Sequence, residues 1–459
     1  MEKKETPQRN LRRFFVVGRE PEKVTFRFAE RNASFNFSGT FRFADYIWLA
    51  FLLATTCCGS ASGSRLTFSQ ADSLLVLRNY DLRSARLAIT AAEGQLAQSG
   101  RYDNPTVSVM YNIQNPTNHR WFDPGCTSET DIQFSQPIAI GGQHAELVRQ
   151  NAALLRASHN QLTVTNRDLR SEVHVAMVDL YYQQRQAAVY DEEIASAEKI
   201  LTAYREQTAK GNIAAIETQR IATMVYQLSK SRADLLLEAS ALQARLRQLL
   251  VLPADDSITV DINEKEALGA ASQLYLAVAA TPTTAVNTMP EMLLTGSQAE
   301  AAAHALSWER SQSLPQVSIQ GEYDKNGSIG HNFFAVGLSV AVPLWNRNRG
   351  NIRKAQAAVE QAAVDADRQR NAIMQQRRAD LDIVGQYLRQ LAEPAPTLDS
   401  DLSEMLHAAE KQFMSRHISL VEFVDLYSNY RDTMLARLDA KSRMLQAAER
   451  LRIAWGSAQ

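Results

Sequence analysis

From Val336 to Ile352 the sequence is VGLSVAVPLWNRNRGNI. In its first half, Val336, Leu338 and Val340 fall on one face of a β-strand, and glycine, serine and alanine fall on the other. Pro343 ends this alternation, and the following segment, rich in Ala, Gln, Arg and Asp, predicts a long helix. The fold therefore includes a strand with one bulky and one small face that leads directly into a long helix.

An earlier stretch, TDIQFSQPIAIGGQHAEL, has the same organisation, with Pro137 lying 206 residues before Pro343. Upstream, NPTVSVMYN resembles LPQVSIQGEYD, and downstream Tyr181 and Tyr387 are again 206 residues apart. Several matches at a nearly constant offset indicate an internal duplication.

Each copy is expected to contain a helix, two strands and a hairpin of long helices. The first repeat is placed at 62–252, a linker at 253–291 and the second repeat at 292–459. The expected elements are strands at about 105–114 and 130–140, a helical hairpin at 143–250, strands at about 315–324 and 332–343, and helices at about 350–392, 398–415 and 418–455.

The first long helix is predicted by the absence of Gly and Pro from Gln143 to Lys210. An unbroken helix of this length extends roughly 100 Å at 1.5 Å per residue. Val173, Leu180 and Leu201 belong to a series of apolar residues spaced at sevens, which predicts a coiled-coil seam.

Residues 1–61 are interpreted as a signal peptide, because the apolar run YIWLAFLLA precedes small residues and cleavage after Ala61 fits. The basic stretch before this run is unusually long, which suggests a mis-called start, with translation beginning later. A genuine amino-terminal extension is the alternative.

Composition excludes several functional classes. A formal net charge of −1 gives no basic footprint for a nucleic-acid partner. The eight histidines are scattered without ligand spacing, so surface or loop roles are expected, and after signal cleavage only Cys126 remains as a free thiol. No catalytic constellation, metal site or cofactor is predicted, and a metal site at Cys126 would be the observation in favour of an enzyme.

The strands favour a membrane-embedded sheet. The bulky face is expected to contact lipid and is formed by Val107, Val109, Tyr111, Val317, Ile319, Val336, Leu338 and Val340. Four strands cannot close into a membrane barrel, which generally needs eight or more, but three chains would supply twelve. Pairing the edges between subunits would satisfy the backbone groups that lipid cannot.

With these motifs in the order NP-VSVMY, QPIAIGGQ, LPQVSIQGEY and VAVPLWNRNRGNI, the chain resembles the TolC-type outer-membrane efflux proteins from Leu66 to its end. The junction PLWNRNRGNI is most similar to the branch that exports cobalt, zinc and cadmium or copper and silver. The resemblance implies a mainly α-helical homotrimer, with a twelve-stranded β-barrel in the outer membrane of a Gram-negative bacterium and a helical tunnel through the periplasm. It also implies a passive exit duct that docks onto a periplasmic adaptor and an inner-membrane RND-type pump, with no enzymatic activity.

The resemblance also implies roles for particular residues. Two helix-helix turns would dock the adaptor, Glu422 and Asp425 would form carboxylate rings with raised pKa values at the tunnel constriction, and Phe413 stands where some members carry a gating tyrosine. The docking turns are Lys210, Gly211, Asn212 and Ile213 in the first copy and Ser415, Arg416, His417 and Ile418 in the second. Plain connectors and a solvated acidic face are the simpler alternatives.

A soluble periplasmic coiled-coil protein, such as an adaptor, is the alternative function. In that case the apolar strand faces would be buried in the core of a small domain rather than exposed to lipid.

Overall fold

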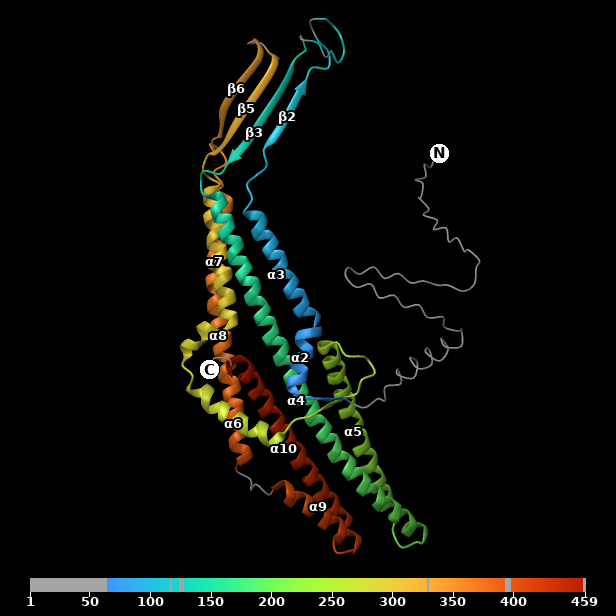
Figure 1. Ribbon diagram of the computed structural model, residues 1–459. Helices are drawn as coiled ribbons and strands as arrows, with labels where there is room; N and C mark the ends of the chain where they lie inside the picture. Colours follow the sequence, from blue (N-terminus) through green and yellow to red (C-terminus); the bar gives the residue numbers. More distant parts are fainter. Residues whose placement is uncertain are drawn as a thin grey trace, which may run out of the picture. The chain divides into compact units, whose positions relative to one another are not determined.

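Long helices and one four-stranded sheet account for most of the computed structural model (Figure 1). The structure describes residues 64–115, 118–123, 125, 128–327, 330–392 and 398–456. The expected signal peptide and Cys126 lie outside these residues. The elements are β1 (Ser64–Leu66), α2 (Phe68–Arg78), α3 (Tyr80–Ser99), β2 (Thr106–Tyr111), β3 (Thr130–Ile138), α4 (Gln143–Ala209), α5 (Ala215–Leu250), β4 (Ile258–Val260), α6 (Glu264–Ala280), the 3-10 helix η1 (Thr283–Thr288), α7 (Pro290–Ser311), β5 (Gln316–Gly327), β6 (Gly330–Ala341), α8 (Arg349–Ala392), α9 (Leu398–Met414) and α10 (Leu420–Trp455).

The sheet has the order β2-β3-β5-β6, with all neighbours antiparallel. Its register aligns Val107 with Phe134 and Val317 with Val340, whereas Ser318 is opposite Ser339. Because directly opposed residues share a face, the pairing places all eight predicted lipid-contacting residues on one side of the sheet. The other side carries mainly small and polar residues.

The apolar face of the sheet is open in the protomer. The exposed fractions of Val336 and Leu338 are 86% and 71%, which differs from the buried face that the soluble alternative requires. Among the described strands, β2 pairs only with β3 and β6 only with β5, so each leaves one edge available to another chain. A sheet with two open edges and an exposed apolar face is incomplete as a monomer.

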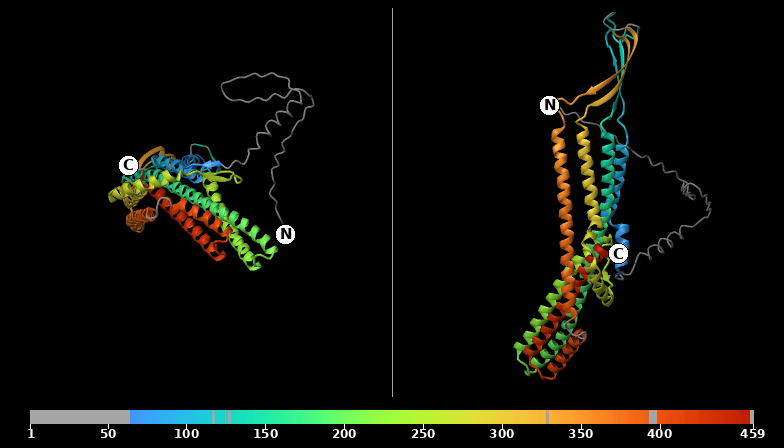
Figure 2. Two further views of the ribbon diagram at one scale, coloured as in Figure 1. Left: turned by 90° about the horizontal axis from the view of Figure 1, so that it is seen from below. Right: turned by 90° about the vertical axis from the view of Figure 1, so that its left-hand side faces the viewer.

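The four-stranded sheet lies at one end of the long helices, and the α4–α5 and α9–α10 turns lie at the other end (Figures 1 and 2). Helix α4 has 67 residues and follows Gly142, whose positive φ of 77° suits a residue without Cβ. Val173, Leu180 and Leu201 of the predicted seam are buried. The prediction of a mainly helical chain with a long uninterrupted helix is confirmed.

The expectation of a linker at 253–291 is wrong. This stretch forms β4, α6 and η1 and the start of α7; β4 pairs with β1 in parallel, and α6 lies against α10 with an ion pair of 2.7 Å between Glu264 and Lys441. The alanines of this stretch are strong helix formers, and Asn263 caps the first turn of α6 by accepting from the Glu266 amide.

Within the described part of the chain, no helix combines the length and the apolar character needed to cross a membrane.

Candidate functional site

Both helix-helix turns end the preceding helix with the same hydrogen bonds. In the first turn, Gly211 N–H donates to Thr208 O and Asn212 N–H to Gln207 O, at 3.0 and 2.9 Å. In the second turn the corresponding bonds, 205 residues later, are Arg416 N–H to Phe413 O and His417 N–H to Gln412 O, again at 3.0 and 2.9 Å. Each turn is therefore a Schellman motif, and the duplication extends to the hydrogen bonds of the turn.

The turns expose polar side chains and partly bury one isoleucine each. The half-buried residues are Ile213 and Ile418, and the other six predicted docking residues are exposed. His417 Nδ1 lies 2.6 Å from the Ser415 hydroxyl, and the Asn212 amide donates to Gln207 Oε1 at 2.8 Å. The side-chain contacts stiffen both turns and leave their outer surfaces accessible to a partner.

The two turns differ at the residue with left-handed backbone. Its φ is 76° at Gly211 and 62° at Arg416, a conformation that costs an L-residue about 1 kcal/mol relative to glycine. We expect Arg416→Gly to stabilise the protein by about this amount and Gly211→Arg to destabilise it equally. Thermal unfolding in detergent should show opposite shifts, with the double variant close to wild type; shifts of the same sign would contradict this.

Glu422 has a local structural role that the sequence interpretation did not include. Its carboxylate accepts the Ser419 N–H at 2.7 Å, while the Ser419 hydroxyl accepts the Glu422 N–H, forming a capping box at the start of α10. The backbone hydrogen bond from Ser419 lowers the pKa of Glu422 in the protomer, and the raised pKa values expected for a trimeric carboxylate ring stay a prediction. Asp425 is exposed one turn further along and accepts from the Asn429 amide.

Phe413 is buried in the protomer. Its ring stacks on Tyr204 of α4 and on Phe423 of α10, with centroids 5.6 and 4.4 Å apart, and Phe423 contacts Tyr427 at 4.9 Å. We call Tyr204, Phe413, Phe423 and Tyr427 the aromatic stack. It joins the two helical hairpins close to their turns.

A buried acid lies in the same part of α4. Glu193 is fully buried, and neither carboxylate oxygen has a hydrogen-bond partner; the nearby hydroxyls of Ser196 and Tyr427 are likewise buried. Burial raises the pKa of Glu193 to about 8, with Arg431 opposing the rise and Asp432 reinforcing it. The apolar periodicity of α4 could not reveal that Glu193 is buried, because residues of α10 cover this face of the helix.

The raised pKa predicts a pH-dependent stability. Glu193 is protonated in the folded protein and titrates near 4.3 when unfolded, so the folded state binds more protons between about pH 5 and 8. The free energy of unfolding should fall by about 1.4 kcal/mol per pH unit as pH rises through this window. Glu193→Gln should flatten the dependence of thermal unfolding on pH, whereas Glu192→Gln, at the exposed neighbour, should retain it. Equal slopes in all three proteins would contradict the assignment.

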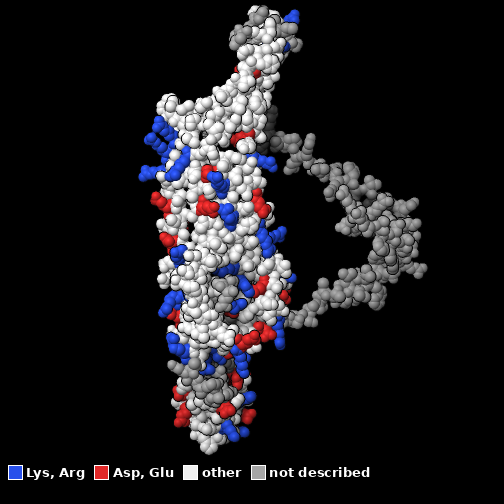
Figure 3. Space-filling model, turned by 60° about the vertical axis from the view of Figure 1, so that its left-hand side comes forward, with Lys and Arg blue, Asp and Glu red and all other residues white. Residues whose placement is uncertain are grey.

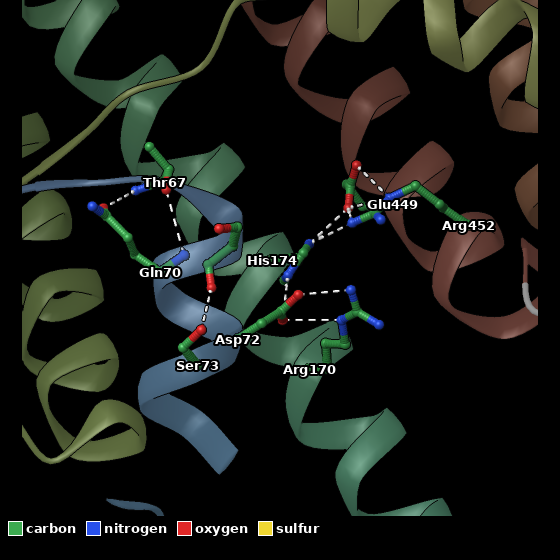
Figure 4. Close-up of polar contacts among 9 residues, drawn as sticks. Thr67, Gln70, Asp72, Ser73, Arg170, His174, Glu449 and Arg452 are labelled. Carbon is green, nitrogen blue, oxygen red and sulfur yellow. Dashed lines mark hydrogen bonds and ion pairs between the residues drawn. The ribbon is translucent and has the colours of Figure 1, made fainter. Parts of the chain in front are cut away.

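Another buried polar group joins α2, α4 and α10 (Figure 4). His174 is fully buried, with Nε2 2.9 Å from Asp72 and Nδ1 2.8 Å from Glu449; Arg170 pairs with Asp72, and Arg452 pairs with Glu449. Burial alone would raise the pKa of Glu449, but hydrogen bonds from His174 and Arg452 outweigh it and lower that pKa. The expected surface or loop position is therefore wrong for His174, which contributes to helix packing.

Among the described residues, no group of three or more His, Cys, Asp or Glu side chains is arranged to hold a metal ion. The site consists instead of a two-faced sheet, a long helical body and two exposed turns.

Known proteins combine these features. Residues 73–251 match the family of outer membrane efflux proteins. The chain is 25% identical over 298 residues to the nickel-cobalt-cadmium resistance protein NccC of Alcaligenes xylosoxydans xylosoxydans, covering 61% of this chain and 62% of NccC. It is 21% identical over 302 residues to the cobalt-zinc-cadmium resistance protein CzcC of Cupriavidus metallidurans, covering 63% of this chain and 66% of CzcC. These matches span just under two thirds of each relative.

The fold is that of solved outer-membrane channels. The CmeC outer membrane channel of Campylobacter jejuni superposes with a TM-score of 0.68 at 15% identity, covering 85% of each chain. The chain thus shares with this channel the fold of a sheet that leads into a long helical body. The match to the outer membrane efflux protein family covers residues 73–251, and over most of the chain the similarity to these channels is one of fold.

Proposed function

We propose that this protein is the outer-membrane exit duct of a tripartite efflux system and passively conducts metal cations from a pump to the exterior. The observation that carries the proposal is the exposed apolar face on a sheet with two open edges. Three copies would pair these edges into a twelve-stranded barrel, with the apolar face toward lipid and the polar face toward a water-filled lumen.

The helices would then continue the barrel into the periplasm as a tunnel. The turns at 210–213 and 415–418 would dock a periplasmic adaptor coupled to an inner-membrane RND-type pump, which supplies the energy. Glu422 and Asp425 from three subunits would add negative charge at the tunnel end, which favours cations over anions. The names of NccC and CzcC support a metal cargo.

The first experiment measures the mass of the mature protein, extracted from outer-membrane fractions in mild detergent, by light scattering corrected for bound detergent. A trimer that needs detergent is expected. A water-soluble monomer or dimer would contradict the duct and favour a periplasmic coiled-coil role.

Cargo requires a second experiment. A strain that has the cognate pump and adaptor but lacks this duct should lose tolerance to cobalt, zinc, nickel or cadmium and regain it on complementation. If metal tolerance were unchanged and tolerance to organic drugs were lost, the cargo would be organic drugs rather than metal cations.

A further inference from the structure

A cluster of exposed basic side chains lies at the corner where β6 is followed by α8. Arg347, Arg349, Arg353 and Lys354 are all exposed, and no acidic residue occurs from Pro343 to Val359. We call these four residues the basic corner. Figure 3 shows Lys and Arg gathered just below the strands on this side of the molecule.

The basic corner differs from the other charged surface of α8. Further along the helix, Arg368 pairs with Asp365 at 3.0 Å and Arg378 with Asp382 at 3.0 Å. Within the described residues, no carboxylate forms an ion pair with any member of the basic corner. Four unpaired cations within eight residues produce a concentrated positive potential.

The duplication provides an internal comparison. At the matching corner of the first copy, Glu146 pairs with Arg149 and lies 2.9 Å from His304 Nδ1. There the charges are balanced within the protomer. The positive corner is therefore a feature of the second copy rather than a requirement of the strand-to-helix connection.

Exposed apolar side chains stand beside the cations. The exposed fraction of Trp345 is 94%, and Leu344 and Val342 are also more than half exposed. An exposed tryptophan with arginines two and four residues further along is the arrangement found where a protein crosses from hydrocarbon into the headgroup layer.

A shallow cavity of about 440 Å³ opens at the same corner, lined in part by Trp308, Asn346 and Asn351. Its carboxylate, Glu309, already accepts the Asn348 side-chain amide at 2.6 Å. The cavity therefore offers an indole, amide groups and one carboxylate next to the basic corner, and these groups suit the hydroxyls of a glycerol headgroup whose phosphate lies toward the cations.

We propose that the basic corner binds anionic phospholipid headgroups in the membrane leaflet that faces the periplasm. The inference rests on the proposed function, which places β6 in the outer membrane and α8 in the periplasm. From Arg349 to Lys354 the helix rises about 8 Å, so all four cations stay within roughly one Debye length of the membrane surface. The corner would select anionic lipid and fix the height of the duct in the membrane.

The test titrates the purified full-length protein in mild detergent with phosphatidylglycerol or phosphatidylcholine of the same chain length, and native mass spectrometry counts bound lipid. At low salt we expect phosphatidylglycerol to bind at least tenfold more tightly. Since each cation near a membrane surface contributes about fivefold, Arg347→Gln/Arg349→Gln should weaken phosphatidylglycerol binding between about five- and twenty-five-fold and leave phosphatidylcholine binding unchanged.

The matched control is Arg368→Gln/Arg378→Gln, which removes the same charge from α8 about 25 Å or more further along the helix. It should bind both lipids as the wild type does. An equal loss in both double variants would show that net charge, rather than the corner, sets the affinity, and would overturn the proposal. Unchanged affinity in the corner variant would also overturn it, as expected if a neighbouring subunit covers the corner.

Insertion into vesicles separates this inference from the proposed function. If the wild type resists carbonate extraction from pure phosphatidylcholine vesicles but shows no preference for phosphatidylglycerol, only the lipid inference fails. If it never inserts, the duct itself is contradicted and the lipid inference fails with it.

Discussion

Leu338→Arg is expected to prevent stable insertion of the protein into bilayers, whereas Ser339→Arg is expected to insert normally. Leu338 lies on the apolar face in register with Ile319, and Ser339 lies on the opposite face in register with Ser318. An arginine on the lipid side of a barrel strand costs about 2–4 kcal/mol at the bilayer midplane, and on the lumen side it contacts water. Three subunits would each bear this cost.

The two positions form a matched pair, because they are adjacent on β6, both exposed in the protomer, and receive the same new side chain. Flotation of carbonate-washed vesicles measures insertion, and circular dichroism checks that both variants retain their helices. Equal insertion of the two variants would contradict the assignment of the faces. Loss of both would show that the strand tolerates no added charge and that its two sides are equivalent.

The two-faced sheet could be predicted because strand period and register have simple geometry. Alternation from Val336 to Val340 assigns a face, Pro343 marks the end of the strand, and the long run without Gly or Pro predicts α4. Each of these signals comes from residues close together in the sequence, and tertiary contacts do not override it. The first Schellman turn can also be predicted from the sequence, because Gly211 stands where a left-handed residue is needed.

The errors arose where a residue's partner is distant in sequence. His174 is buried because Asp72 and Glu449 reach it from α2 and α10, 102 and 275 residues away. The contact of Phe413 with Tyr204 of the other copy is equally distant in sequence, and no pattern within α9 reveals it. The role of Glu422, however, is local. Ser419 followed three residues later by Glu422 is a capping-box signature, and the assignment of Glu422 to a tunnel constriction did not take it into account. Glu422 can contribute to a trimeric ring only in addition to this role.

Phe423→Ala is expected to destabilise the protein by about 3–5 kcal/mol, since Phe423 is fully buried at the centre of the aromatic stack. Loss of the ring leaves a cavity between Phe413 and Tyr427. It also removes the contact by which α10 supports α9 near the turn. Because this stack joins the hairpins, the variant should also conduct more ions in planar bilayers than the wild type. Apolar packing would then be what holds the end of the tunnel narrow.

Two further variants separate packing from general damage. Phe423→Leu keeps most of the volume and should cost less than about 1.5 kcal/mol, and Val421→Ala, at a position on the same helix that is 58% exposed, should have almost no effect. Thermal unfolding and single-channel conductance are measured on all three proteins. A drop in stability without a change in conductance would limit the stack to a structural role, because the width of the tunnel would then depend on contacts elsewhere. A rise in conductance graded as Ala above Leu above wild type would link the packing of Phe423 directly to opening.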